Sequence, residues 1–152
     1  MTRSLDFYFD FISPYSFLAH KKIENMSKKK IININYKPIL LGGLHNLGGI
    51  TAPAFNERKM KNMKNDCEIV AKKNTIEFKW NSKFPINSLN LMRGYLVLSK
   101  ELKKKFFDLC FDAYWKDNID LSDKNNLEYI LDNCSINKDS FFVEIQDQKV
   151  KE

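Results

Sequence analysis

The feature that most constrains the fold of this chain is an alternation of apolar and polar side chains that runs directly into a helix start signal. Apolar side chains occupy every second position across residues 5–11, a period of two that is typical of a β-strand. Ser13 and Pro14 follow at once. Serine is a favoured helix N-cap, and proline is favoured at the first helical position. The order therefore predicts a strand that ends where a helix begins, with Ser13 at the junction.

The next residues predict the rest of a strand-helix-strand unit. Apolar side chains recur at helical spacing after Pro14, and this predicted helix ends in the lysine run of residues 28–30. Residues 32–37 alternate again and predict a second strand, which Pro38 closes. Two strands joined by one helix through short links form a βαβ unit, with parallel strands and a right-handed crossover.

Helical patterns dominate the remaining residues. Apolar faces predict helices through residues 60–71, 87–99 and 102–113, and another helix after Ser122. The last apolar segment, residues 137–145, also alternates like a strand, but we interpret it as a helix capped by Asn137. A glycine-rich stretch, residues 42–49, predicts a loop. No third strand is evident, although two parallel strands make a poor sheet by themselves.

Length, composition and charge exclude several classes of protein. The chain has 152 residues, 43% of them hydrophobic, which suits one domain with an ordinary core. We expect a cytoplasmic protein without a membrane partner, because no signal peptide is visible and no apolar run approaches about 20 residues. The net charge is +6, but the lysines are spread along the chain and arginine is scarce. No nucleic-acid partner is therefore expected.

The cysteines and histidines predict no metal centre. Cys67, Cys110 and Cys134 are far apart and form no CxxC motif, so we expect each to pack as a small apolar residue. His20 and His45 are interpreted as isolated, without a carboxylate or cysteine at a metal-binding spacing.

The segment from Ser13 to Ser16 is the candidate site for chemistry. A helix N-terminus stabilises anions, and a thiolate in particular. The segment contains no cysteine, which disfavours disulfide exchange by this chain itself. A serine hydroxyl can still donate a hydrogen bond to a thiolate that a ligand brings. The alternative that stays open is that Ser13 and Pro14 only cap the helix.

Several segments, in order along the chain, are similar to one known family. The string DFYFDFISPYSFLA, residues 6–19, closely resembles the opening of the 2-hydroxychromene-2-carboxylate isomerase and kappa-class glutathione transferase family. The resemblance continues in PILLGG (38–43), GGITAP (48–53), FPINSLNLMR (84–93), AYW (113–115) and DLSD (120–123). It therefore covers nearly the whole chain, and the opening string and the FPINSL segment are its most specific parts.

The resemblance implies an α/β protein of the thioredoxin-like class. Residues 1–40 would be the βαβ unit and residues 41–152 a large DsbA-like helical insertion. The family continues past residue 152 with a ββα segment, so residues 1–152 would form a single incomplete thioredoxin-like domain.

The resemblance also implies glutathione as cofactor, with its sulfur near Ser13 and further contacts from Pro14 and Tyr15. Many family members contact glutathione through an asparagine where this chain has Ile50, and Asn46 is a candidate replacement.

The implied activity is a glutathione-dependent isomerisation of a small aromatic or chromene-type substrate, with Ser13 as catalytic residue. A homodimer is also implied, because relatives often dimerise. A kappa-like glutathione transferase and a catalytically inactive truncated fragment are the alternatives. Asn87 and Arg93 could orient a carboxylate substrate or serve as capping and buried polar residues.

Overall fold

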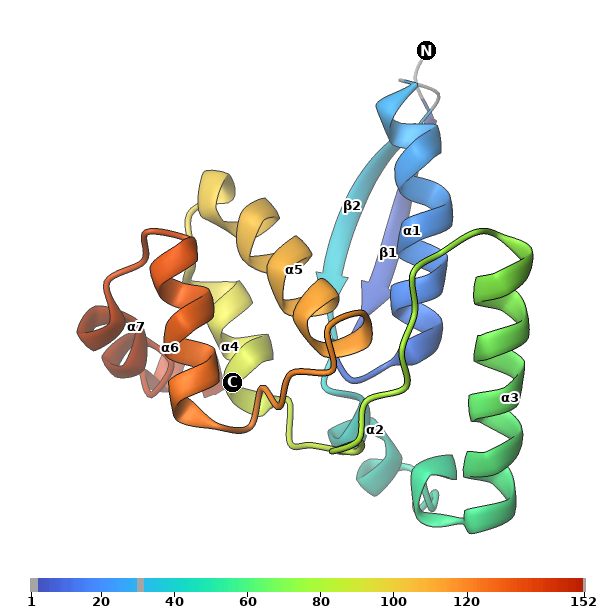
Figure 1. The fold of residues 1–152 in the computed structure, drawn as a ribbon. Helices are drawn as coiled ribbons and strands as arrows, with labels where there is room; N and C mark the ends of the chain where they lie inside the picture. Colours follow the sequence, from blue (N-terminus) through green and yellow to red (C-terminus); the bar gives the residue numbers. More distant parts are fainter. Residues whose placement is uncertain (1–2, 30–31, 152) are drawn as a thin grey trace.

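A two-stranded parallel sheet and the helix between its strands form the N-terminal part of the fold (Figure 1). The computed structural model describes residues 3–29 and 32–151. Strand β1 (Arg3–Phe9) pairs with β2 (Ile32–Pro38), and α1 (Pro14–Lys28) connects them. Leu5 lies opposite Ile34 in the register. The predicted βαβ unit is confirmed, although β1 ends at Phe9 because a turn begins at Asp10.

The described residues after β2 contain helices and no further strand. They are α2 (Leu41–Leu47), the 3-10 helix η1 (Pro53–Phe55), α3 (Glu57–Lys73), α4 (Leu89–Val97), α5 (Lys100–Trp115), α6 (Lys124–Asn133), α7 (Lys138–Glu144) and α8 (Gln148–Lys151). The helices predicted from apolar periodicity are confirmed. The last segment is a helix, and the Asn137 side chain caps it by accepting a hydrogen bond from the Ser140 amide.

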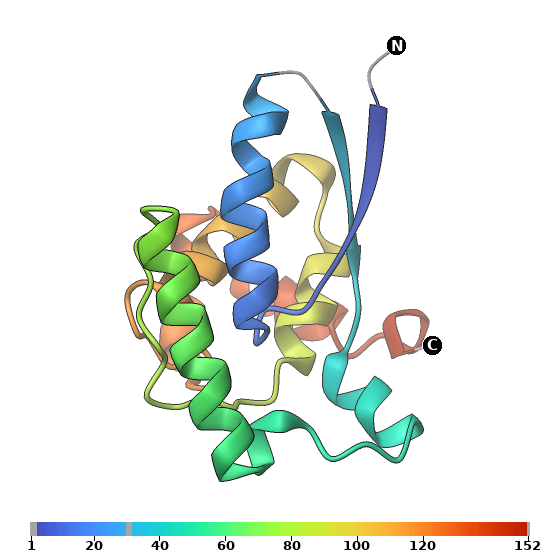
Figure 2. The same ribbon diagram turned by 90° about the vertical axis from the view of Figure 1, so that its right-hand side faces the viewer.

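The helices lie in layers beside the sheet. Figure 2 shows the sheet, α1 and α3 in succession, with α1 between its two neighbours. Figure 1 shows α4, α5, α6 and α7 as a group on the other side of the molecule. Helix α5 contacts both α1 and α6, so it joins this group to the βαβ unit. Within residues 3–29 and 32–151, no helix has both the length and the apolar character needed to cross a bilayer.

An aromatic cluster fixes the end of β1 to α5. Phe9 and Phe11 are completely buried, and their rings contact Phe107 and Phe111 at centroid distances of 4.8 and 5.2 Å. The indole Nε1 of Trp115 donates a hydrogen bond of 2.9 Å to the Phe11 carbonyl oxygen. The chain immediately before Ser13 is thus held by side chains about a hundred residues further on.

The interpretation of residues 42–49 as a loop is wrong for their first part. Gly42 and Gly43 lie within α2, and only Gly48 and Gly49 form the irregular link that follows. The reason is a long-range cap, because the amide of Leu41 donates a 2.8 Å hydrogen bond to the buried carboxylate of Asp10. No local pattern reveals that contact. Gly49 has φ of +61°, where glycine is the least strained residue.

Gly94 gives a test of the helical packing. A Cβ there would lie 2.4 Å from Cζ and 2.6 Å from Cε2 of Phe141, a ring that is only 2% exposed. Gly94→Ala should therefore lower the free energy of unfolding by about 1–2 kcal/mol, because the strain of overpacking exceeds the gain in helix propensity. Urea unfolding measures the change.

Gly42→Ala is the matched control, because it also lies in a helix and a Cβ there meets nothing within 4 Å. It should leave stability unchanged or raise it by up to about 1 kcal/mol. Equal stabilities of the two variants would contradict the packing of Phe141 against α4.

Candidate functional site

Ser13 caps the first turn of α1. Its amide donates to the Asp10 carbonyl at 3.0 Å, and its Oγ accepts a 3.1 Å hydrogen bond from the Ser16 amide. A serine hydroxyl has one donor hydrogen and two acceptor lone pairs. Since capping uses only a lone pair, the hydroxyl hydrogen of Ser13 stays available for a ligand. The capping role is therefore present, and it does not exclude a role in binding.

A hollow of about 480 Å³ lies beside this junction and has mostly apolar walls. Ser13, Pro14 and Tyr15 line it from the start of α1, so three of the five predicted binding residues are brought together. The facing walls come from η1, α3 and the segment before α4. Their apolar side chains are Pro53, Phe55, Met63, Phe84, Pro85 and Ile86.

Asn46 and Ile50 line a second, adjoining hollow of about 760 Å³. The two hollows share wall residues, among them Ile12 and His45. Asn46 and Ile50 are both exposed, and neither is part of the wall beside Ser13. The five predicted binding residues thus belong to one continuous surface, divided between two connected hollows.

The structure also places the two residues that could orient a carboxylate. Asn87 borders both hollows, but its Oδ1 accepts a 3.0 Å hydrogen bond from the Leu89 amide, which is a capping role. Arg93 lies on α4 and lines neither hollow.

Tyr15 presents a protonated phenol to the site. Partial burial, with neighbouring Cys67 and Asp66, raises the pKa of Tyr15 to about 12. Asp66 lies close to its hydroxyl. The ring itself is 47% exposed, so it forms part of the rim of the smaller hollow.

Asp10 supports the site from behind. Its side chain is 1% exposed, and its two oxygens accept hydrogen bonds from the amides of Leu41 at 2.8 Å and Ile12 at 3.2 Å. Burial raises the pKa of Asp10, and these hydrogen bonds oppose the rise only in part. One carboxylate thus joins the end of β1 to the start of α2, both of which border the hollows.

The three cysteines pack as predicted. All are free and buried. Burial raises the pKa of Cys67 to about 12 and also raises the pKa values of the Cys110 and Cys134 thiols. None of them is therefore a thiolate at neutral pH, and the chain brings no reactive thiol of its own to Ser13.

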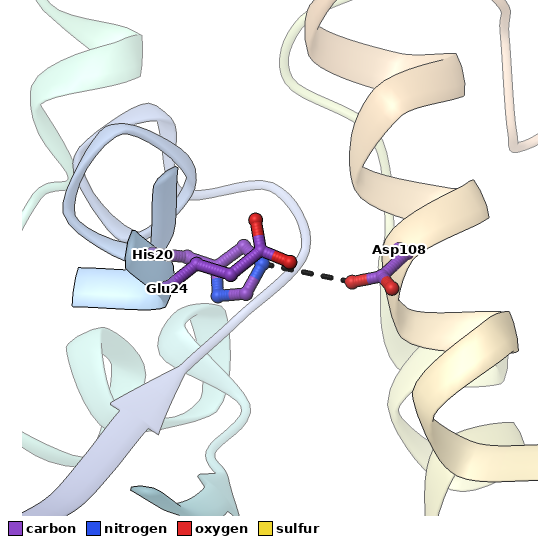
Figure 3. Close-up of side chains that lie close together, drawn as sticks. All are labelled: His20, Glu24 and Asp108. Atoms are coloured by element: carbon purple, nitrogen blue, oxygen red, sulfur yellow. Dashed lines mark ion pairs between the residues drawn. The ribbon is translucent and has the colours of Figure 1, made fainter. Parts of the chain in front are cut away.

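The prediction that His20 is isolated is wrong. Glu24 follows it by one helical turn on α1, and Asp108 faces both from α5 (Figure 3). The candidate ligand atoms of the three side chains all lie within 4.8 Å of one another. The four-residue spacing of His20 and Glu24 is a signal that the sequence itself carries. Asp108 could be found only from the packing of α5 against α1.

Comparison with known proteins gives the family. The model of the DSBA-like thioredoxin domain matches residues 4–152. The chain belongs to the DsbA-like thioredoxin domain family. Its α/β fold with a βαβ unit and many helices agrees with this membership.

Two proteins with sequences similar to this DsbA-like chain are named as isomerases. The 2-hydroxychromene-2-carboxylate isomerase of Sphingobium xenophagum is 28% identical over 142 residues, covering 92% of this chain and 72% of the relative. The enzyme of the same name from Pseudomonas putida is 25% identical over 118 residues, covering 76% of this chain and 57% of that relative. A solved 2-hydroxychromene-2-carboxylate isomerase structure superposes with a TM-score of 0.85 at 20% identity, over 97% of this chain and 73% of that one.

The buried Asp10 carboxylate gives a prediction for stability against pH. Because the folded-state pKa is raised, the native state binds this proton more tightly than the unfolded state, and stability falls as pH rises from about 4 through the folded pKa. Asp10→Asn removes the titration. The unfolding free energy of the variant minus that of the wild type should therefore increase between pH 4 and pH 7.

Urea unfolding at the two pH values measures this difference. Asp66→Asn is a control at another carboxylate near the site, on α3. If the difference in unfolding free energy between Asp10→Asn and wild type is the same at both pH values, ionising Asp10 costs no more in the folded state than in the unfolded state.

Proposed function

We propose that this DsbA-like chain binds glutathione with its sulfur beside Ser13 and promotes the isomerisation of a small aromatic or chromene-type substrate. One observation carries the proposal: the Ser13 Oγ accepts a hydrogen bond from the Ser16 amide at a helix N-terminus that borders an apolar hollow. Because this cap uses only a lone pair of the oxygen, the hydroxyl hydrogen is available to a ligand. The names of the relatives supply the reaction class.

The groups around Ser13 fit a ligand thiol. The N-terminal end of α1 favours negative charge, and the Ser13 hydroxyl can donate to it. Within the described residues, no cysteine other than Cys67 lies near this end, and its raised pKa keeps it a neutral thiol. The adjoining hollow offers the exposed Asn46 amide for the peptide part of the tripeptide. Bound glutathione would supply a nucleophilic thiol that can add reversibly to a double bond.

The chain's own contribution is to hold the thiolate and to exclude water. If Ser13 and the helix end together lowered the thiol pKa by two units, they would favour the thiolate by about 2.7 kcal/mol. Tyr15 stays protonated, so it can donate a hydrogen bond but cannot act as a base at neutral pH. The apolar walls keep the reacting groups partly desolvated.

The size and chemistry of the smaller hollow support an apolar substrate. Its volume of about 480 Å³ falls within the range of about 300–1,000 Å³ for small-molecule sites. Phe55, Met63 and Phe84 present apolar or aromatic surface to it. A flat aromatic molecule in this hollow would contact these side chains and Tyr15.

Substitutions at Ser13 can separate its capping role from its role as a donor. Ser13→Thr keeps both the acceptor and the hydroxyl hydrogen. Ser13→Asp keeps the cap, and its charge suits a helix N-terminus, but it has no donor and repels a thiolate. We expect reduced glutathione to raise the melting temperature of wild type and Ser13→Thr, by the equivalent of about 2.7 kcal/mol at a hundredfold excess over Kd. Ser13→Asp should show no rise.

Ser16→Ala is the control on the same helix, because the Ser16 side chain lines neither hollow. The unliganded melting temperature of Ser13→Asp should equal or exceed that of wild type, which verifies that the fold is intact. A glutathione-induced rise in Ser13→Asp equal to that of wild type would refute the role of the hydroxyl. Loss of free glutathione during turnover would indicate a transferase instead of an isomerase.

Phe55 tests the contribution of the apolar walls, because it lines both hollows. Its ring is 74% exposed at the rim. Phe55→Ser should raise KM for an aromatic substrate about fivefold, because roughly 1 kcal/mol of apolar contact is lost. Val143→Ser on α7, where the side chain is 73% exposed, is the matched control and should leave KM unchanged.

A further inference from the structure

We propose that His20, Glu24 and Asp108 form a binding site for one divalent transition-metal ion of the zinc class, between α1 and α5. Figure 3 shows the three side chains converging, two from α1 and one from α5. The site is separate from the Ser13 hollows, because His20 lies seven residues further along α1, about 10 Å in the direction of the helix axis.

Two buried polar atoms face each other without a hydrogen bond. His20 is 0% exposed, and its Nε2 has no hydrogen-bond partner among the described residues. Oδ1 of Asp108 is also buried and also lacks one. The two atoms are 3.6 Å apart, beyond hydrogen-bond distance. Two ligands of a tetrahedral zinc ion lie about 3.4 Å apart, so a cation between these atoms would satisfy both.

The surroundings of His20 are those of a metal ligand. Its Nδ1 lies 3.0 Å from the hydroxyl of Tyr36, and a ligating histidine normally donates its other ring N–H to such a partner. When a metal ion takes the lone pair of Nε2, the Tyr36 hydroxyl can accept the proton of Nδ1. The rings of Phe107 and Phe111, at centroid distances of 4.7 and 6.0 Å, hold the imidazole in place.

Lysine ammonium groups contact both carboxylates. Lys104 bridges the two carboxylates, and Lys28 lies 3.2 Å from Glu24.

The lysines are cations that a metal ion must displace. Lys104 contacts Oδ2 of Asp108, which leaves Oδ1 facing His20. The side chains of Lys104 and Lys28 are 55% and 66% exposed, so both can move into solvent without leaving a cavity. The ammonium of Lys104 thus balances the carboxylates in the metal-free chain, and the bound ion replaces it.

The donor set indicates the class of ion. One imidazole nitrogen with two carboxylate oxygens suits zinc and neighbouring first-row ions better than calcium or magnesium, which prefer oxygen ligands alone. Three protein ligands leave a fourth position for water.

Calorimetric titration of the purified chain with Zn²⁺, with Co²⁺ as a spectroscopic probe, tests the site. We expect one ion per chain. His20→Gln and Asp108→Asn should weaken binding about a hundredfold, and Tyr36→Phe about tenfold through loss of the outer contact. Lys104→Met should strengthen binding, because it removes the competing cation.

Two matched variants serve as controls. His45→Gln alters the other histidine, and Asp112→Asn alters the carboxylate one turn further along α5, which pairs with Lys21 at 2.7 Å. Both should bind like wild type. Circular dichroism verifies folding, and if His20→Gln does not fold, Asp108→Asn and Tyr36→Phe decide. The proposal would be overturned if wild type and Lys104→Met both failed to bind either ion. It would also be overturned if wild type and Asp108→Asn bound the ion with equal affinity, and the cluster would then be an ion pair only.

Discussion

The attachment of the end of β1 to α5 is the interaction on which the rest of the structure depends. A two-stranded parallel sheet has little stability of its own. Here Phe9 and Phe11 place their rings among those of Phe107 and Phe111, and Trp115 donates to the Phe11 carbonyl. Because this contact joins the first dozen residues to the fifth α-helix, it also determines where Ser13 and the start of α1 lie. The candidate site is thus positioned by the core rather than by its own loop.

The sequence predicted those parts of the fold that local patterns determine. Alternation gave both strands, and apolar faces gave the long helices, because each signal lies within one element. Helix α2 was missed, since its glycines favour a loop and its cap comes from Asp10, which is distant in sequence. Ser13 was identified because capping is local. The apolar wall opposite, with Phe55 and Met63, depends on how η1 and α3 fold back and has no local signature.

Asp10 and Ser13 show a division between stability and function at the same junction. A buried carboxylate whose pKa is raised by burial costs stability at neutral pH. In return it orders the backbone of Ile12 and Leu41 on both sides of the hollows. Ser13, by contrast, stabilises the helix with a lone pair and leaves its proton unused. An arrangement selected only for stability would need neither a buried charge nor an available donor beside an apolar hollow.

Helix α1 connects this junction with the His20 cluster. Its N-terminus carries Ser13, and two turns later His20 is enclosed by Tyr36 from β2 and by Phe107 and Phe111 from α5. A helix turns as a rigid body, so the enclosure of one buried ring prevents rotation of the whole element about its axis. The position of Ser13 therefore depends in part on contacts made well outside the hollow. An ion bound between α1 and α5 would further restrict the rotation of α1 about its axis. Because Ser13 lies at the N-terminal end of the same helix, that restriction would extend to the candidate site.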